Sequence, residues 1–264
     1  MDHFHIHLYT LVYNGNWYLL NSHLGVTMKI FGIIDLSTLD YPKKCSSVVF
    51  MSGCNMRCGY CHNYIQMKKN TYNIPPYKVY RSIDLTFSEA IVVSGGEPTV
   101  QPQALMEFCR IVKREGNLPI KLDTNGSNVD IVRELIQEGL IDYLAVDVKC
   151  AFEKYWDIAQ YDGSKIESNV KKLIKICKKE GVFVECRTTY IPEKMDKRDI
   201  YTIVRTVKDC DLYALQQFDR EHSWKEEYRR MREPTLEELV ELGKIAKEYI
   251  PSVVVRSKEG ILYL

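Results

Sequence analysis

Hydrophobic positions from residue 28 onward follow two alternating patterns. Short runs rich in β-branched residues predict buried strands at Ser46–Ser52, Ala90–Ser94, Pro119–Asp123, Tyr143–Val148, Phe183–Tyr190, Asp211–Phe218 and Ser252–Arg256. Stretches with helical periodicity lie between them, at Gln103–Glu115, Val129–Glu138, Glu167–Glu180, Asp199–Lys208 and Thr235–Glu248. Because strands and helices alternate, right-handed crossovers make such a series parallel. We therefore expect a single α/β domain whose parallel sheet forms a partial (β/α)6-type barrel.

Glycines follow three of the expected helices. Gly116, Gly139 and Gly181 stand where a left-handed residue commonly ends a helix, so we expect all three to be left-handed C-caps.

The first 27 residues differ from the rest of the chain. His3, His5 and His7 alternate, so on a strand their imidazoles would share one face and could bind a metal. The simpler interpretation is a peripheral N-terminal extension, or an upstream start that precedes a native start at Met28. We expect residues 1–27 to be such an extension and residues 28–264 to be the functional domain.

Composition limits the possible functions. The 264 residues contain 36 Lys and Arg against 35 Asp and Glu, so the net charge of +1 does not indicate bulk electrostatic binding to nucleic acid or to acidic membranes. No apolar run approaches the roughly 20 residues that span a bilayer. No secretory signal begins the chain, so the nine cysteines indicate a reducing cytoplasm. Most of the six scattered ones are expected to be small buried hydrophobes: Cys45, Cys109, Cys150, Cys177, Cys186 and Cys210.

Three cysteines on one short loop are the most informative feature. Cys54, Cys58 and Cys61 have the spacing C-x3-C-x2-C, with no fourth cysteine nearby. A four-iron cluster needs one ligand per iron, so three cysteines leave one iron open, and open metal sites are typical of catalysis. A structural zinc site is the alternative, but its fourth ligand would have to be His62, directly adjacent to Cys61. A non-catalytic iron–sulfur or zinc module would likewise complete the metal shell with a fourth protein ligand.

Further polar clusters end the predicted strands. They are Ser94-Gly95-Gly96-Glu97-Pro98, Asp123-Thr124-Asn125-Gly126, Asp147-Val148-Lys149 and the Arg187 strand. Ligands bind at the carboxyl ends of parallel strands, so their shared position favours one site. Each cluster also has a structural interpretation. The glycines and the Asn-Gly pair could form ordinary turns, Asp147 and Lys149 could form an ion pair, and Arg187 could pair with any of these carboxylates.

The cysteine loop, Cys-Asn-Met-Arg-Cys-Gly-Tyr-Cys-His-Asn, resembles the signature of radical S-adenosylmethionine (SAM) enzymes, with Tyr60 as the aromatic residue. Its His-Asn ending is similar to glycyl-radical-enzyme activases. The Gly-Gly-Glu, Asp-Thr-Asn-Gly and Asp-Val-Lys motifs resemble those of pyruvate formate-lyase activase. The segment Ile34–Pro42 resembles activating proteins of anaerobic ribonucleoside-triphosphate reductase. The resemblance extends from about Gly32 to Phe218.

The resemblance implies a role for each matching residue. Cys54, Cys58 and Cys61 would hold a [4Fe–4S] cluster whose open iron chelates SAM. The residues implied to contact SAM fall into three groups: Tyr60 and His62 along the nucleoside; Gly95, Gly96 and Glu97 at the amino group; Asp123, Asp147, Val148 and Lys149 at the carboxylate and ribose, with a bridging cation as an option. Arg187 is a further implied contact.

The implied reaction is reductive cleavage of SAM, which gives a 5′-deoxyadenosyl radical that abstracts a hydrogen from a glycine of a partner enzyme. We expect that partner to be an anaerobic ribonucleotide reductase, and reduced flavodoxin or ferredoxin to donate the electron. The range 63–90 contains no cysteine, which favours the compact single-cluster type. Another glycyl-radical enzyme, or a small-molecule or nucleotide substrate, is the alternative.

Three features are not settled by the resemblance. Lys43 replaces the glycine usual after Pro42. Gln217 or His222 could take the place of a histidine that relatives hold over SAM. The charged segment Glu221–Arg232 could be a docking surface, a lid or a solvated helix face.

Overall fold

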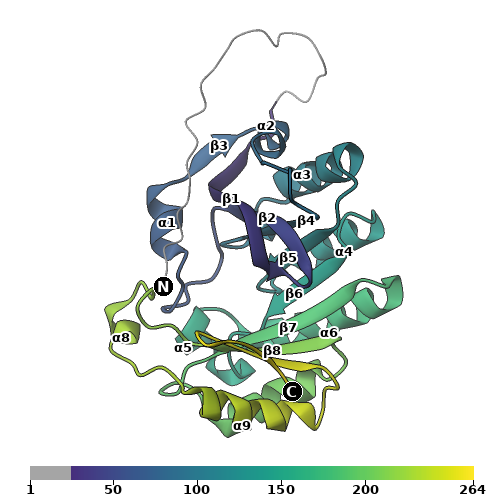
Figure 1. Ribbon diagram of the computed structural model, residues 1–264. Coiled ribbons are helices and arrows are strands. Elements are labelled where there is room, and N and C mark those ends of the chain that lie inside the picture. Colours follow the sequence, from purple (N-terminus) through teal and green to yellow (C-terminus); the bar gives the residue numbers. More distant parts are fainter. Residues whose placement is uncertain (1–24) are drawn as a thin grey trace, which may run out of the picture.

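The computed structural model describes residues 25–264, so the alternating histidines of the expected extension lie outside the described residues. The described chain forms one ten-stranded sheet in the order β10-β9-β8-β7-β6-β5-β4-β2-β1-β3. Strands β3 and β10 stand at opposite ends of this order, so the sheet curls without closing (Figure 1). The expected α/β domain with a partial barrel is confirmed. No helix among residues 25–264 is long and apolar enough to cross a bilayer.

Seven neighbouring strands are parallel, and they are the seven that the hydrophobic runs predict. They are β2 (Lys44–Met51), β4 (Ala90–Gly95), β5 (Ile120–Thr124), β6 (Tyr143–Asp147), β7 (Phe183–Tyr190), β8 (Leu212–Gln217) and β9 (Val253–Ser257). Their carboxyl ends therefore meet at one edge of the sheet, as the site prediction requires.

Three antiparallel strands at the sheet margins were not predicted. They are β1 (Met28–Tyr41), β3 (Tyr72–Ile74) and β10 (Gly260–Tyr263). A two-residue turn joins β1 to β2, with Pro42 first and Lys43 second. Lys43 has φ 62°, a left-handed conformation that glycine adopts with less strain. The substitution of lysine for the usual glycine therefore leaves the hairpin formed but strains its turn.

The five predicted helices are present. They are α3 (Pro102–Glu115), α4 (Val129–Gln137), α6 (Gly163–Glu180), α7 (Lys197–Val207) and α9 (Leu236–Lys247). Short helices that were not predicted accompany them: α1 (Tyr64–Lys69), α2 (Pro76–Arg81), α5 (Tyr155–Ala159), α8 (Glu226–Arg229) and the 3-10 turns Pro98–Val100 and Phe152–Lys154. Figure 1 shows α3, α4 and α6 along one side of the sheet, whereas α1 and α8 lie on the other side.

The glycine caps are confirmed in two of three cases. Gly139 has φ 65° after α4 and Gly181 has φ 72° after α6. Gly116 was wrongly predicted as a left-handed cap, because it continues the right-handed conformation with φ −115°. The chain reverses at the next residue instead, where Asn117 has φ 48°.

The two faces of the sheet differ in chemistry. The outer face packs against the helices in the main core, with Val49, Ile91, Leu122 and Leu144 fully buried. The inner face has a smaller apolar cluster of Tyr41, Val48, Ala90, Val92, Tyr143 and Ala145. Since side chains alternate along a strand, Asp147 shares the inner face with Ala145. The inner face therefore changes from apolar to charged towards the carboxyl ends of the strands.

Candidate active site

The cysteine loop follows β2 and is held from several directions by backbone hydrogen bonds. The carbonyl of Gly53 accepts from the amide of Glu97 at 2.8 Å, and the amide of Arg57 donates to the carbonyl of Ala159 at 2.9 Å. The loop is therefore fixed both to the end of β4 and to the end of α5.

The three thiols of this loop lie within electrostatic reach of one another and of Lys149. Burial raises the pKa of Cys58 to about 12 and that of Cys54 to about 11, and it also raises the pKa of Cys61. The Lys149 ammonium opposes this effect at all three thiols. Without a metal the thiols are protonated at neutral pH, so a bound metal must displace their protons.

Cys54 also has nitrogen donors around its sulfur. The Met56 amide lies 3.4 Å from Cys54 Sγ and Asn125 Nδ2 lies 3.9 Å from it. Asn125 Nδ2 also donates to Asn55 Oδ1 at 2.9 Å, and Asn55 Nδ2 donates to Ser127 Oγ at 2.9 Å. The Asp-Thr-Asn-Gly motif therefore supports the cysteine loop through its asparagine, a contact that the sequence did not indicate.

Gly95 and Gly96 are required by the neighbouring backbone. A Cβ at Gly96 would lie 2.1 Å from the Gly53 carbonyl oxygen, and one at Gly95 would lie 2.3 Å from the Met51 carbonyl oxygen. Gly95 also has φ 126°, which side chains rarely tolerate. The amide of Gly96 donates to the Met51 carbonyl at 2.9 Å. The two glycines thus seat the end of β4 directly against the start of the cysteine loop.

Glu97 is fully buried and its carboxylate is occupied by protein donors. Oε1 accepts from the Thr99 amide at 3.1 Å, the Thr99 hydroxyl at 2.5 Å and the Thr124 hydroxyl at 2.8 Å. Oε2 accepts from the Asn125 amide at 2.6 Å. Burial nevertheless raises the pKa of Glu97, because desolvation exceeds the effect of these bonds. Glu97 therefore joins the ends of β4 and β5.

The remaining predicted residues form one charged network across β5, β6 and β7. Arg187 Nε donates to Asp147 Oδ1 at 2.7 Å, and Arg187 Nη1 lies 3.3 Å from Asp123 Oδ1. Lys149 Nζ lies 2.8 Å from Asp147 Oδ2. Lys121 Nζ lies 3.2 Å from Asp123 Oδ1. Both structural interpretations made from the sequence, an Asp147–Lys149 ion pair and a carboxylate-bound Arg187, are confirmed.

The network keeps its members charged. Burial opposes the charge of Asp147, but Arg187 and Lys149 outweigh it and hold the pKa of Asp147 well below its usual range. Burial also tends to raise the pKa of Asp123, but the Arg187 charge outweighs it, so the pKa of Asp123 is lowered. The carboxylates in turn raise the pKa of Lys149 and of Arg187 above their ordinary values. The backbone of Val148 belongs to this edge too, since its amide donates to the Arg187 carbonyl at 2.8 Å.

The segment 219–231 packs against the cysteine loop, a contact that the sequence analysis did not predict. Trp224 Nε1 donates to the Cys58 carbonyl at 2.7 Å, and the Lys225 amide donates to the Gly59 carbonyl at 3.2 Å. A Cβ at Gly59 would lie 2.2 Å from the Tyr228 ring, so only glycine leaves room for this contact. The available signal was a tryptophan and a tyrosine among charged residues.

Tyr60 and His62 both face this segment. Tyr60 is buried with its ring centroid 6.1 Å from that of Tyr228, and its hydroxyl has no hydrogen-bond partner among the described residues. His62 lies 5.5 Å from His222, ring centroid to ring centroid, and His222 Nδ1 is 2.6 Å from Asp219 Oδ2. The contacts of Tyr60 and His62 with a nucleoside stay predictions.

Gln217 is held by protein at both ends of its amide. Nε2 donates to the Pro234 carbonyl at 2.9 Å, and Oε1 accepts from the Lys258 amide at 2.7 Å. His222 is exposed and adjoins His62. The role of either residue over SAM stays a prediction.

Comparison with a protein-family model identifies the family of this chain. The model described as the Radical SAM superfamily matches residues 48–207, which includes the cysteine loop, the glycine pair and the charged network. This chain belongs to the radical SAM superfamily. Family membership implies a [4Fe–4S] cluster and SAM as cofactors.

Similar proteins specify the class of radical SAM enzyme. A candidate glycyl-radical enzyme activating enzyme of Methanocaldococcus jannaschii is 49% identical over 233 residues, which cover 88% of this chain and 97% of that protein. A pyruvate formate-lyase-activating enzyme of Clostridium pasteurianum is 24% identical over 203 residues, covering 71% of this chain and 80% of that protein. The chain is thus a radical SAM enzyme of the glycyl-radical enzyme activating class.

Solved structures support the fold. Streptococcus suis SuiB bound to its precursor peptide SuiA matches with a TM-score of 0.60 and 14% identity, covering 77% of this chain and 45% of that one. SuiB bound to S-adenosylmethionine matches with a TM-score of 0.59 and 13% identity, covering 78% of this chain and 48% of that one. This radical SAM chain spans about half the length of these structures.

The residues present fit the cofactor that the family implies. Three thiols on one loop are a soft donor set of the kind that binds iron–sulfur clusters, and nitrogen donors already surround Cys54 Sγ. Within residues 25–264, no three His, Cys, Asp or Glu side chains gather closely enough around one point to bind a single ion.

Among the scattered cysteines the expectation of burial is largely confirmed. Cys109, Cys150, Cys177, Cys186 and Cys210 are buried, whereas Cys45 is only partly so.

Proposed function

We propose that this activase generates a glycyl radical on an anaerobic ribonucleoside-triphosphate reductase. The observation that carries the proposal is the segment Ile34–Pro42, which resembles activating proteins of that reductase. Here it covers the second half of β1 and the first residue of the turn that follows. The absence of cysteine between residues 63 and 90 supports the compact single-cluster type.

Within this proposal, Cys54, Cys58 and Cys61 hold the cluster, which when bound supplies the electron for reductive cleavage of SAM. Lys149 and Arg187 are the cations available to the SAM carboxylate. Lys149 and Arg187 both form ion pairs with Asp147, so the Asp147 carboxylate fixes their positions before SAM binds.

The other predicted contacts surround this pair. Gly95 and Gly96 bring the end of β4 to the cysteine loop, and Asp123 and Val148 flank Arg187. Glu97 already accepts four hydrogen bonds from protein donors, three at Oε1 and one at Oε2. We propose that the main role of Glu97 is to position Asn125 and Thr99.

The open sheet supports a protein substrate. The sheet does not close between its edge strands β3 and β10, and the charged network lies on its inner face. An extended loop that carries the target glycine needs an approach of this kind, whereas a small molecule would need an enclosed pocket. The one-electron donor in this proposal is reduced flavodoxin or ferredoxin, and the compartment is the reducing cytoplasm.

The proposal is tested by anaerobic electron paramagnetic resonance. The reconstituted enzyme is mixed with SAM, a reductant and, in separate samples, an anaerobic ribonucleotide reductase or a pyruvate formate-lyase. We expect a glycyl doublet with the reductase, and none when its radical-site glycine is replaced by alanine. A doublet only with the lyase would transfer the assignment to another glycyl-radical enzyme. No doublet with either protein, despite formation of 5′-deoxyadenosine, would favour the small-molecule or nucleotide alternative.

A further inference from the structure

An aromatic stack connects the cysteine loop to the protein surface. The Tyr64 and Trp224 rings stack with centroids 4.0 Å apart and planes inclined by 19°. Both residues are partly exposed, and Trp224 donates its indole hydrogen bond to the Cys58 carbonyl. The stack therefore lies between solvent and a cysteine that the family signature assigns to the cluster.

Two lysines lie beside the stack. Lys68 Nζ lies 5.9 Å from the Tyr64 ring centroid, and Lys225 Nζ lies 5.5 Å from the Trp224 ring centroid. Arg57 is exposed within the cysteine loop, and Lys68 and Lys69 are exposed in the last turn of α1. Among the described residues, no carboxylate forms an ion pair with any of these four basic side chains.

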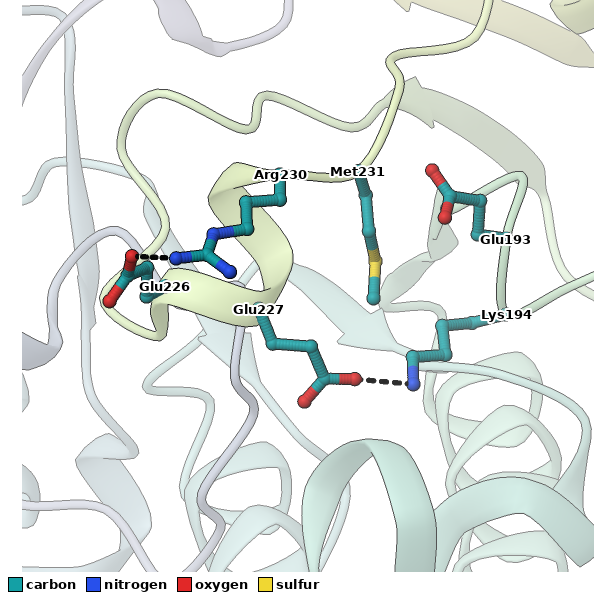
Figure 2. Close-up of a pocket in the computed structure, with 6 residues that line it drawn as sticks. All are labelled: Glu193, Lys194, Glu226, Glu227, Arg230 and Met231. Atoms are coloured by element: carbon teal, nitrogen blue, oxygen red, sulfur yellow. Dashed lines mark hydrogen bonds and ion pairs between the residues drawn. The ribbon is translucent and has the colours of Figure 1, made fainter.

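The nearest acidic residues of α8 are neutralised elsewhere. Figure 2 shows Glu227 paired with Lys194, at 2.7 Å, and Glu226 paired with Arg230. These pairs line a separate open hollow of about 640 Å³ whose other lining residues are Glu193 and Met231. Each of these two acids thus has a cation of its own, although Lys225 also lies within electrostatic reach of Glu227.

We infer that this basic surface, defined as Arg57, Lys68, Lys69 and Lys225 around the Tyr64–Trp224 stack, docks an acidic one-electron carrier protein. The inference deepens the proposed function, because it rests on the need of the same site for an electron. Complementary charge speeds encounter and sets orientation, and the stack places the docked carrier beside Cys58. In the transfer the carrier loses one electron and the cluster gains it, with no bond formed or broken.

The test uses the reconstituted full chain with purified flavodoxin as the probe, and ferredoxin in parallel. The double variant Lys68→Glu/Lys225→Glu is compared with Lys172→Glu/Lys175→Glu, which makes the same change of charge on exposed positions of α6. Two quantities are measured at low salt: the affinity for the oxidised carrier by calorimetry, and the rate of cluster reduction by the reduced carrier in stopped flow. Photoreduced deazaflavin, a small reductant, provides the reference rate.

We expect the first variant to lower affinity and carrier-dependent rate by about tenfold or more and to flatten their dependence on salt. The α6 variant and the deazaflavin rates should stay within twofold of wild type. Because Lys225 adjoins the cysteine loop, Lys68→Gln/Lys69→Gln, which changes only exposed positions of α1, serves as a second variant and should give a smaller loss in the same direction.

Equal losses in Lys68→Glu/Lys225→Glu and in the α6 variant would show an effect of net charge alone and overturn the inference. Unchanged affinity in both basic-surface variants would overturn the inference. It would also be overturned if neither flavodoxin nor ferredoxin bound the wild type. None of these measurements involves the glycyl-radical partner, so they fail or succeed independently of the reductase assignment.

Discussion

The two halves of the site are stabilised in different ways. The charged half, formed by Asp123, Asp147, Lys149 and Arg187, is complete without a ligand, since each charge already has an opposite one within 3.3 Å. The cysteine half has no such internal pairing. Its thiols are protonated at neutral pH, and its loop depends on backbone bonds and on packing against Trp224 and Tyr228.

This difference indicates which part of the site each cofactor must complete. In the proposed assignment, the charged half offers SAM a preformed set of charges, whereas the cysteine half needs metal to remove protons from thiols whose pKa values are raised. Disturbing the first should therefore reduce the stability of the chain itself. Disturbing the second should chiefly affect loading and chemistry.

The largest effect is expected from Cys58→Ala, which removes one of only three thiol ligands. Reconstitution with iron and sulfide should fail to give a competent cluster, and 5′-deoxyadenosine should not form from SAM and dithionite. Cys177→Ala is the matched control, because Cys177 is buried in α6 away from the loop. It should keep the product and cost about 1 kcal/mol of stability. Full activity of Cys58→Ala would contradict the assignment of the loop.

Arg187→Met should cost the cluster-free protein about 3 kcal/mol, because it leaves Asp147 and Asp123 buried without their shared cation. Lys149→Met should cost only about 1 kcal/mol, since Asp147 retains Arg187 and Lys149 is more exposed. Urea unfolding of both variants measures the difference. Equal losses would show that the charged half is not organised around Arg187.

Gly59→Ala should cost about 2 kcal/mol, because the added methyl overlaps the Tyr228 ring. The double variant Gly59→Ala/Tyr228→Ala tests the cause, since it should lose less than the sum of the single changes. Thermal unfolding checks both. Simple additivity would mean that segment 219–231 does not press on the cysteine loop.

The dependence of unfolding free energy on pH tests the charged half of the site separately from the cysteine half. The folded pKa of Asp147 is lowered, so its contribution is present above the unfolded value of about 3.9 and is lost as the pH falls towards the folded pKa. Asp147→Asn should flatten the acid side of the profile by up to about 1.4 kcal/mol per pH unit, the slope of one proton. Denaturant midpoints between pH 5 and acid conditions measure this effect, and parallel profiles would contradict it.

Sequence reasoning reached the parallel strands because each is buried on both faces and reads as a continuous β-branched run. It missed β1 because register shifts between Ile30 and Gly32, and again between Ile34 and Ser37, interrupt the alternation that marks a strand. Strand β3 has only three residues and no hydrophobic run. Strand β10 has an apolar run, but it is only four residues long and is exposed, so it does not mark a buried strand.

The candidate site followed from the topology. Once the strands are parallel, Asp123, Asp147 and Arg187 must meet at one edge. Contacts between distant segments could not be inferred in this way. Trp224 lies 166 positions from Cys58, and no local pattern links the two. The reason for the glycine pair was likewise hidden, because the group that needs the space is the Met51–Gly53 backbone and not a ligand.

The seating of Gly95 and Gly96 on that backbone has a practical result for protein engineering. The metal-binding loop cannot be transplanted to another α/β scaffold as an isolated peptide, because its first residues interlock with the tip of a neighbouring strand. A successful graft must carry both glycines and the strand that bears them.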